Sequence, residues 1–193
     1  MPYQVIQPPF TLKFREMSKQ QLLDYAAWFR SSLDERTSQL EGAVRATPGF
    51  ESWAATFTPE SLEKLGSWFA GAVATRARAP EEMAELKLQG DLGMSPPDVD
   101  LTDRSFSLAM DVGMYLARTF EGTHPGVVWK QYLDNRNFAD YGQPVLNGFG
   151  PVPLNPVRIA VTLAYGLASK KQTGKRLREI FDYWSKQALQ PRH

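Results

Sequence analysis

The sequence predicts a single α+β domain, residues 1–193, that is mainly helical and carries a small antiparallel sheet. The chain has 193 residues, 42% hydrophobic and 12% aromatic, which is typical of one globular domain. Apolar residues recur at helical spacing through most of its length. Short apolar runs bounded by Gly and Pro are typical of a few strands.

The first elements are expected in residues 3–14, where "YQVIQ" and "FTLKF" flank Pro8 and Pro9. Both pentapeptides are typical of short strands, and the second alternates apolar with polar residues. Proline cannot donate to a ladder, so at least part of this region is not a central strand.

Two amphipathic helices are predicted over residues 18–45 and 58–78. Ser18 and Gln21 form a capping-box pattern, and Thr58 with Pro59 is a good helix start. The two segments match at six positions 40 residues apart: Ser18/Thr58, Leu22/Leu62, Tyr25/Leu65, Trp28/Trp68, Phe29/Phe69 and Leu33/Val73. We therefore expect two similar helices that pack together.

A short helix is expected over residues 80–90, and an acidic surface loop, "GDLGMSPPDVDLTD", over residues 90–103. A central helix, 103–121, follows, capped by Thr102 or Asp103. Its apolar face carries Phe106, Met110, Gly113, Ala117 and Phe120.

The C-terminal part is predicted to hold strands at 127–133 and 143–149 and helices at 155–169 and 174–189. The linking stretch "YGQPVLNGFGPVPLNP" has seven Gly or Pro among its 16 residues. We interpret it as the end of a strand, tight turns and the Asn155-Pro156 start of a helix. It is not a phosphate loop, because no Gly-Lys-Ser/Thr follows; whether it binds another ligand is left open.

The sequence lacks the residues that several kinds of catalytic or metal site require. There are no cysteines, which excludes disulfides, thiol nucleophiles and Cys-containing metal sites. Neither an apolar run of about 18 residues nor a secretory signal is present, so we expect a cytoplasmic protein without membrane contact. No Gly-x-Ser-x-Gly elbow is present to supply a nucleophile for His124. The acidic stretch that begins at Asp98 does not have the glycine that a calcium-binding loop requires. We expect no cofactor and no metal.

Charge is unevenly distributed along the chain. Residues 157–193 carry eight basic and two acidic residues, a net charge of +6, and residues 1–156 carry −5. This asymmetry indicates either a partner surface or two regions that face each other. The basic end, with Phe181, Tyr183 and Trp184, suggests nucleic-acid binding as one alternative. However, Phe181 and Trp184 fall on an apolar helix face, which favours a place in the core over contact with nucleic acid.

Asp111 is the most informative single acid. Ser107, Asp111, Tyr115 and Arg118 share one stripe of the central helix. In an enzyme, Asp111 would be a general acid or base in a pocket with Tyr115 and Arg118. In a structural interpretation, which we favour, Asp111 pairs with an arginine or a backbone donor.

The WF-bearing helices, "AMDVGMYLARTF", "QPVLNGF" and "NPVRI" together resemble a family of small uncharacterised bacterial proteins over residues 10–185. Single-domain bacterial proteins of this sort often accompany toxins as immunity proteins. The resemblance therefore implies a non-enzymatic protein that binds a cognate toxin domain by occlusion. We expect the contact to use the acids of the loop: Asp91, Asp98, Asp100 and Asp103.

Overall fold

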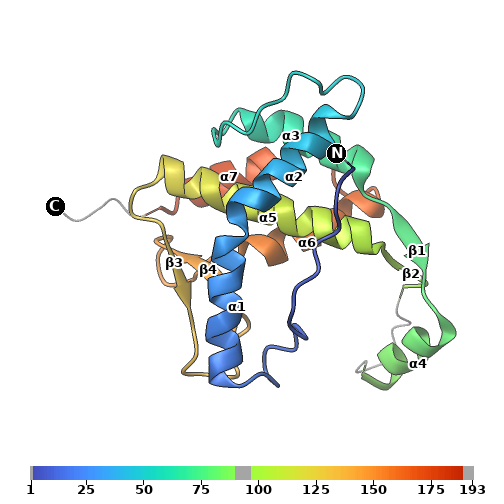
Figure 1. The fold of residues 1–193 in the computed structure, drawn as a ribbon, viewed down its shortest axis with the longest axis vertical. Helices are drawn as coiled ribbons and strands as arrows, with labels where there is room; N and C mark the ends of the chain where they lie inside the picture. Colours follow the sequence, from blue (N-terminus) through green and yellow to red (C-terminus); the bar gives the residue numbers. More distant parts are fainter. Residues whose placement is uncertain (1, 90–96, 189–193) are drawn as a thin grey trace.

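The structure, a computed structural model, describes residues 2–89 and 97–188. In these residues the chain forms seven helices and two small antiparallel sheets, which confirms the mainly helical α+β class (Figure 1). The elements are α1 Lys19–Ser31, α2 Leu33–Arg45, α3 Ser61–Ala72, β1 Thr75–Ala77, α4 Pro80–Gln89, β2 Val99–Leu101, α5 Asp103–Thr123, β3 Val128–Gln131, β4 Pro144–Asn147, α6 Pro156–Ala168 and α7 Arg176–Ser185.

Helix α5 is the central element, and the other helices are arranged around it (Figure 1). Fourteen of its 21 residues are buried, as expected of a helix that is covered on most sides. It begins where predicted, because the Thr102 side chain accepts a hydrogen bond from Ser105 N. Helix α6 lies along α5, while α2 crosses it on another side.

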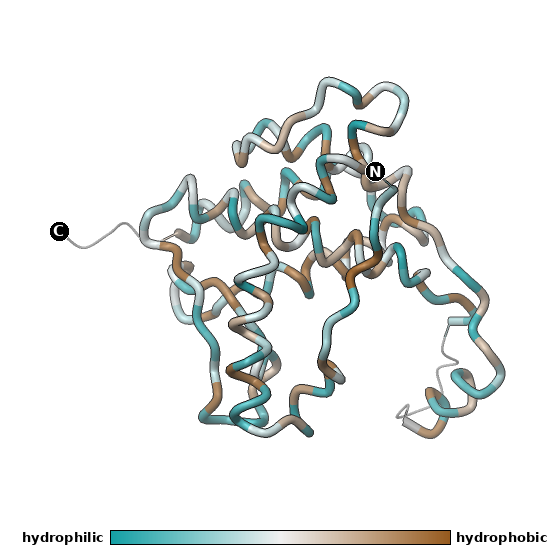
Figure 2. The backbone as a smooth tube through the Cα atoms, viewed as in Figure 1, coloured by the Kyte–Doolittle hydropathy of each residue, from teal (hydrophilic) through white to brown (hydrophobic). Residues whose placement is uncertain are grey.

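The core has two hydrophobic clusters, and α5 contributes to both of them. Leu108, Val112 and Leu116 face the larger cluster, whereas Met110 and Met114 face the smaller one. Figure 2 shows hydrophobic and hydrophilic residues alternating along the helices, as amphipathic helices require. The arrangement makes α5 the wall that both clusters share.

The two WF-bearing helices pack in different places. In α1, Phe29 is buried in the smaller cluster, while Trp68 and Phe69 of α3 are buried in the larger one. The 40-residue offset therefore marks two amphipathic helices, but they are not the mutually packed pair that we predicted. Similar apolar faces do not determine which cluster each face covers.

Helix boundaries differ from the prediction at several places. The helix predicted over 18–45 divides at Ser32, where both the backbone N–H, at 3.0 Å, and the hydroxyl, at 2.8 Å, donate to Trp28 O. The Ser18 capping box is present as predicted. The second helix begins at Ser61 instead of Thr58 and ends at Ala72, because residues 75–77 leave it to pair with β2.

Strands differ more from the prediction than helices do. Residues 3–14 form no strand; this N-terminal segment (residues 2–16) is irregular, with a turn at 14–16, and its Ile6 N–H donates to the side chain of Ser107. The loop predicted over 90–103 contains β2 within its described part, which pairs with β1. The predicted strands 127–133 and 143–149 are present as the shorter pair β3 and β4.

The Gly/Pro-rich stretch 141–156 is built of a strand, turns and a helix start, as predicted. Leu146 of β4 forms a bridge with Leu154, and Asn155 caps α6 by accepting a hydrogen bond from Arg158 N at 3.0 Å. Gly148 has φ of 120°, and a Cβ there would lie 2.5 Å from Gly126 O. Only glycine fits this turn.

Gly113 of α5 allows close contact between α5 and α6. A Cβ at this position would lie 2.7 Å from Val157 Cα and 2.8 Å from Pro156 O. Both contacted atoms belong to backbone, so they cannot move aside as a flexible side chain would. By contrast, a Cβ at Gly42 of α2 would meet nothing within 4 Å.

We predict opposite effects for the same substitution at these two helical glycines. Gly113→Ala should lower the free energy of unfolding by about 2 kcal/mol, since overpacking a core costs about 1–3 kcal/mol. Gly42→Ala should raise it by roughly 0.5–1 kcal/mol, because alanine restricts the unfolded chain. Urea denaturation measures both values, and a stabilising effect of Gly113→Ala would contradict the packing described here.

Candidate functional site

Asp111 lies in a buried ion pair with Arg36 of α2. Arg36 Nε donates to Asp111 Oδ1 at 2.8 Å and Nη2 donates to Oδ2 at 2.7 Å, a bidentate arrangement. The two side chains are 6% and 0% exposed. The structural interpretation of Asp111 is therefore the one that the geometry supports.

The N-terminal segment completes this ion pair. The Tyr3 hydroxyl donates to Asp111 Oδ2 and lies 2.7 Å from Ser107 Oγ, and Arg36 Nη1 donates to Gln4 O at 3.0 Å. Burial raises the pKa of Asp111, although the bonds from Arg36 and Tyr3 oppose this shift. Burial and the Asp111 charge also raise the pKa of the Tyr3 hydroxyl.

Tyr115 and Arg118 do not join Asp111 in a pocket. The Tyr115 hydroxyl lies 2.7 Å from Ser61 Oγ and accepts a hydrogen bond from Phe57 N, while Arg118 pairs with Asp34 at the surface. Tyr115 is fully buried in the larger cluster. The stripe seen in the sequence thus serves three separate contacts, because α5 has different neighbours along its length.

The acids predicted to bind a partner have different environments. Asp98 and Asp103 are exposed and form no ion pair with another described residue, whereas Asp91 lies outside the described residues. Asp100 is mostly buried: Arg78 donates to it at 2.7 Å and the Tyr165 hydroxyl at 2.6 Å. Asp100, the middle residue of β2, therefore stabilises the fold and is not available to a partner.

Residues 75–101, which we call the arm, consist of β1, α4 and β2 in their described part and extend away from the helical body (Figure 1). Arg76 and Glu82 form a bidentate pair at 2.8 and 2.7 Å, which lowers the pKa of Glu82 to about 2. With the Arg78–Asp100 pair, this leaves the arm less negative than its sequence suggested. Its exposed acids without an ion pair to a described residue include Glu81 and Asp98.

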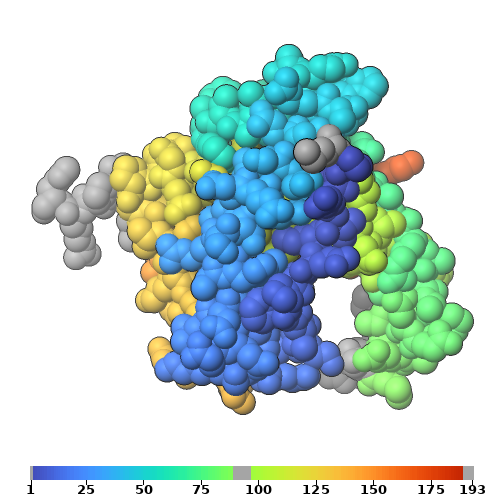
Figure 3. Space-filling view, in the orientation of Figure 1, coloured from blue at the N-terminus to red at the C-terminus, as the bar shows by residue number. Residues whose placement is uncertain are grey.

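A groove runs along the N-terminal segment. Two cavities of about 440 Å³ each lie along it, and Leu12 lines both. One cavity lies between the segment and helices α5 and α6, and the other is lined by the segment, by residues from 139 to 143 and by Glu85 of the arm. Figure 3 shows the open gap that separates the segment, in dark blue, from the arm, in green. The first cavity has Phe106, Met110 and Val161 among its apolar lining residues and Asp103 as its charged one.

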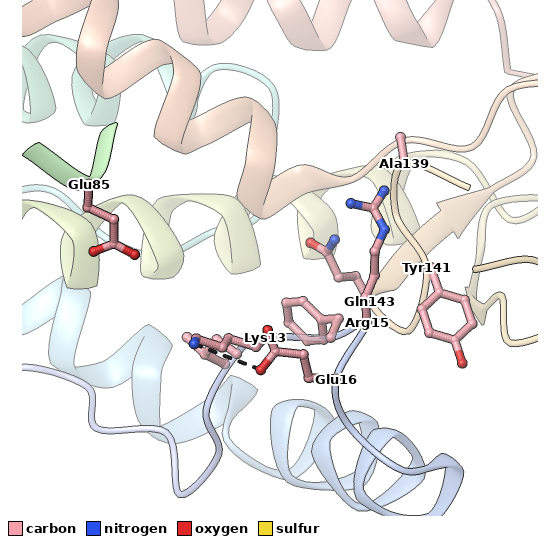
Figure 4. A pocket seen from close by; sticks show the side chains of 9 residues that line it. Lys13, Arg15, Glu16, Glu85, Ala139, Tyr141 and Gln143 are labelled. Carbon is pink, nitrogen blue, oxygen red and sulfur yellow. Dashed lines mark ion pairs between the residues drawn. The ribbon is translucent and has the colours of Figure 1, made fainter. Parts of the chain in front are cut away.

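The second cavity of the groove brings charged side chains from distant segments together. Figure 4 shows Glu85 of α4 on the wall opposite Lys13 and Glu16, which form an ion pair at 3.8 Å. Leu12 is 41% exposed and has φ of 57°, a conformation that a leucine rarely adopts. An exposed apolar side chain on strained backbone is typical of a binding surface.

His124 connects the end of α5 with α7. It caps the C-terminus of α5, its Nε2 lies 2.9 Å from Ser185 Oγ, and its ring stacks on Phe181. The residue thus joins α5 to α7. Burial lowers the pKa of His124 below its ordinary value.

The basic C-terminal region is partly neutralised by acids from elsewhere. Arg158 pairs with Asp140 at 2.9 Å, and Arg178 pairs with Glu63 at 3.2 Å and Asp182 at 2.8 Å. Phe181 is buried, as its apolar spacing predicted, whereas Tyr183 is 63% exposed. The alternative in which the two charged regions face each other is therefore correct in part.

Arg36 is the site residue that sequence reasoning missed. It lies among apolar positions of α2, four residues before Leu40 and three after Leu33. The available signal was a pair of opposite charges, Arg36 and Asp111, each of which occupies a position with the spacing of core residues in its helix. Nothing in the sequence pointed to Tyr3.

Comparison of the chain with protein-family models, curated proteins and solved structures finds no match. None of the helices in the described residues is long and apolar enough to cross a membrane. Within residues 2–89 and 97–188, no three His, Asp or Glu side chains are grouped so that they could hold a metal ion.

The buried ion pair predicts a strongly non-additive mutant cycle. Asp111→Leu alone should cost about 3–5 kcal/mol of unfolding free energy, because it leaves Arg36 buried without a counter-charge. The double variant Arg36→Met/Asp111→Leu should cost less than the sum of the single variants. The matched surface pair, Arg118 with Asp34, should contribute no more than about 1 kcal/mol. Additive losses, measured by urea denaturation, would show that the two buried charges are not coupled.

His124 predicts a loss of stability on acidification. Its folded-state pKa is lowered, so the unfolded chain binds a proton more readily once the pH falls below about 6.5, the ordinary histidine value. This contribution is fully present above that pH and is lost as the pH falls through the folded-state value. His124→Gln should therefore reduce the fall in melting temperature between pH 7.5 and pH 5.5, values of about one unit either side. An equal fall in both proteins would contradict this role.

Proposed function

We propose that this protein is a protein-binding protein, and that its groove receives a basic segment with apolar side chains from a partner. The observation that carries the proposal is the composition of the groove. Exposed Leu12 and the apolar side chains Phe106 and Met110 provide the contact area. Exposed Asp103 lines the same cavity, and Glu85 lines the cavity beside it.

The chemistry of the groove supports recognition more than catalysis. Asp103 is the charged side chain of the more apolar cavity, so it complements a positive charge on a bound segment, whereas Lys13 and Arg15 balance Glu16 and Glu85 in the other cavity. Asp111, the acid that an enzyme would have used, is bound by Arg36 and Tyr3 behind the N-terminal segment. Neither groove cavity is lined by Asp111, Tyr115 or Arg118.

The resemblance to small bacterial proteins gives the finer form of this proposal. In that form the protein acts in the cytoplasm as an immunity protein, and the partner is a cognate toxin domain. A nuclease-type toxin with a basic substrate surface would satisfy the charge of the groove, and occupation of that surface would block its action.

We predict that two exposed acids control the affinity for such a partner. Asp98→Asn/Asp103→Asn should weaken the complex about tenfold, the lower end of what electrostatic steering contributes. It should also flatten the dependence of affinity on salt, because fewer charges remain to be screened. Affinity capture from the source bacterium, followed by mass spectrometry, identifies the partner. Titration calorimetry at low and high salt then measures the effect.

The control is Asp24→Asn/Asp134→Asn, which removes the same charge from exposed positions outside both the arm and the groove cavities. This variant should bind like the wild type. Leu12→Ser should weaken the complex without changing its salt dependence, because it removes apolar contact only. A partner whose affinity is changed neither by Asp98→Asn/Asp103→Asn nor by Leu12→Ser would show that the groove is not its binding site.

A further inference from the structure

A separate cavity lies between α6 and α7, on the other side of α6 from the groove. Val157 and Val161 of α6 line the groove, whereas Arg158 and Thr162 line this cavity. The cavity has a volume of about 340 Å³, which is in the size range of small-molecule sites. Since α6 separates the two, this site is independent of the function proposed for the groove.

The cavity has an apolar floor and an aromatic corner. Ile159 and Ile180 contribute apolar surface. The rings of Tyr183 and Trp184 stand at 87° to each other with centroids 6.0 Å apart. The Trp184 ring also contacts the Phe149 ring in an edge-to-face arrangement, with centroids 5.4 Å apart. Tyr183 is 63% exposed. A flat ring can therefore stack on one side chain and meet the other with its edge.

The charged residues that line the cavity are both arginines, Arg158 and Arg176. Arg158 uses one nitrogen for Asp140, at 2.9 Å, and Arg176 uses one for Glu179, at 3.2 Å. A guanidinium carries five N–H donors, so both keep donors for a ligand. No acidic side chain lines the cavity.

The surroundings of the cavity strengthen its attraction for anions. Lys170, Lys171 and Lys175 lie exposed in and beside the turn between α6 and α7. Arg178, in contrast, faces α3 and is bound by Glu63 and Asp182. The available positive charge of this region is therefore concentrated at the end of α6 and the start of α7, where Arg176 lies.

We propose that this cavity binds a nucleotide, either free or as part of a single-stranded nucleic acid. The base stacks in the corner of Tyr183 and Trp184, since aromatic side chains accept any base face. The phosphate is bound by Arg176 and Arg158, because the guanidinium fork matches phosphate oxygens. Thr162 and Gln172 line the same cavity and supply polar groups for the edge of the base or the sugar.

Two surface variants test the proposal without disturbing the core. Tyr183→Ala removes the stacking surface, and Arg176→Gln removes one phosphate-binding charge. Arg158 is left unchanged, because it neutralises Asp140, whose side chain is only 3% exposed. Lys19→Gln is the matched control, since it removes an equal charge from an exposed position on α1 that does not line the cavity. Thermal denaturation confirms that each variant is folded.

Titration calorimetry of the full chain is carried out with AMP, GMP, CMP and UMP, and with a mixed-sequence single-stranded RNA pentanucleotide. We expect saturable binding that Tyr183→Ala and Arg176→Gln each weaken about tenfold, and that Lys19→Gln changes by less than about twofold. Tighter binding of the pentanucleotide than of every monophosphate identifies single-stranded nucleic acid as the source. Equal affinities identify a free nucleotide.

Two results would overturn the proposal. The first is the absence of saturable binding to all five probes. The second is binding that inorganic pyrophosphate matches and that Tyr183→Ala leaves unchanged, because charge alone would then explain it. Either result is independent of the groove variants, so it leaves the function proposed for the groove untouched.

Discussion

The buried ion pair between Arg36 and Asp111 is the interaction on which the arrangement of the molecule depends. It joins α2 to α5 at 2.7–2.8 Å, and Tyr3, Gln4 and Arg36 extend it to the N-terminal segment. A buried charge is tolerated only when it is paired and hydrogen-bonded, so each partner fixes the position of the others. The N-terminal segment, which forms no sheet, is held in place by these polar contacts, and it forms one wall of the groove.

Helix α5 and helix α6 then place the two candidate sites. Because α5 is covered on most sides, its polar residues serve internal contacts, and little of it is free for chemistry. Helix α6 packs one face on α5 through the close approach at Gly113. Its flanks face the groove on one side and the α7 cavity on the other. The two sites are therefore separated by a helix, so we expect binding at one site to be independent of binding at the other.

Helices were predictable where local signals define them, and contacts between distant residues were not. Ser18, Thr102 and Asn155 each mark a helix start that the structure confirms, because capping involves only neighbouring residues. The strand Thr75–Ala77 is exposed at all three residues, so it has no apolar alternation to reveal it. Of the candidate site, the acids Asp98 and Asp103 were found, but Leu12, Glu85 and Arg36 depend on which segments the fold brings together.

The uneven distribution of charge along the sequence is also explained by contacts between residues that are distant in the sequence. Acids and bases that the sequence separates widely are used in pairs that hold elements together, as Arg158 with Asp140 and Arg178 with Glu63. Such pairs cancel their fields, so the net charge of a sequence region does not describe its surface. What remains exposed decides the chemistry of a partner. The exposed carboxylate of Asp103 borders the groove, and the guanidinium groups of Arg158 and Arg176 border the α7 cavity. In the two proposals the two surfaces therefore bind ligands of opposite charge, although the net charge of the whole chain is nearly zero.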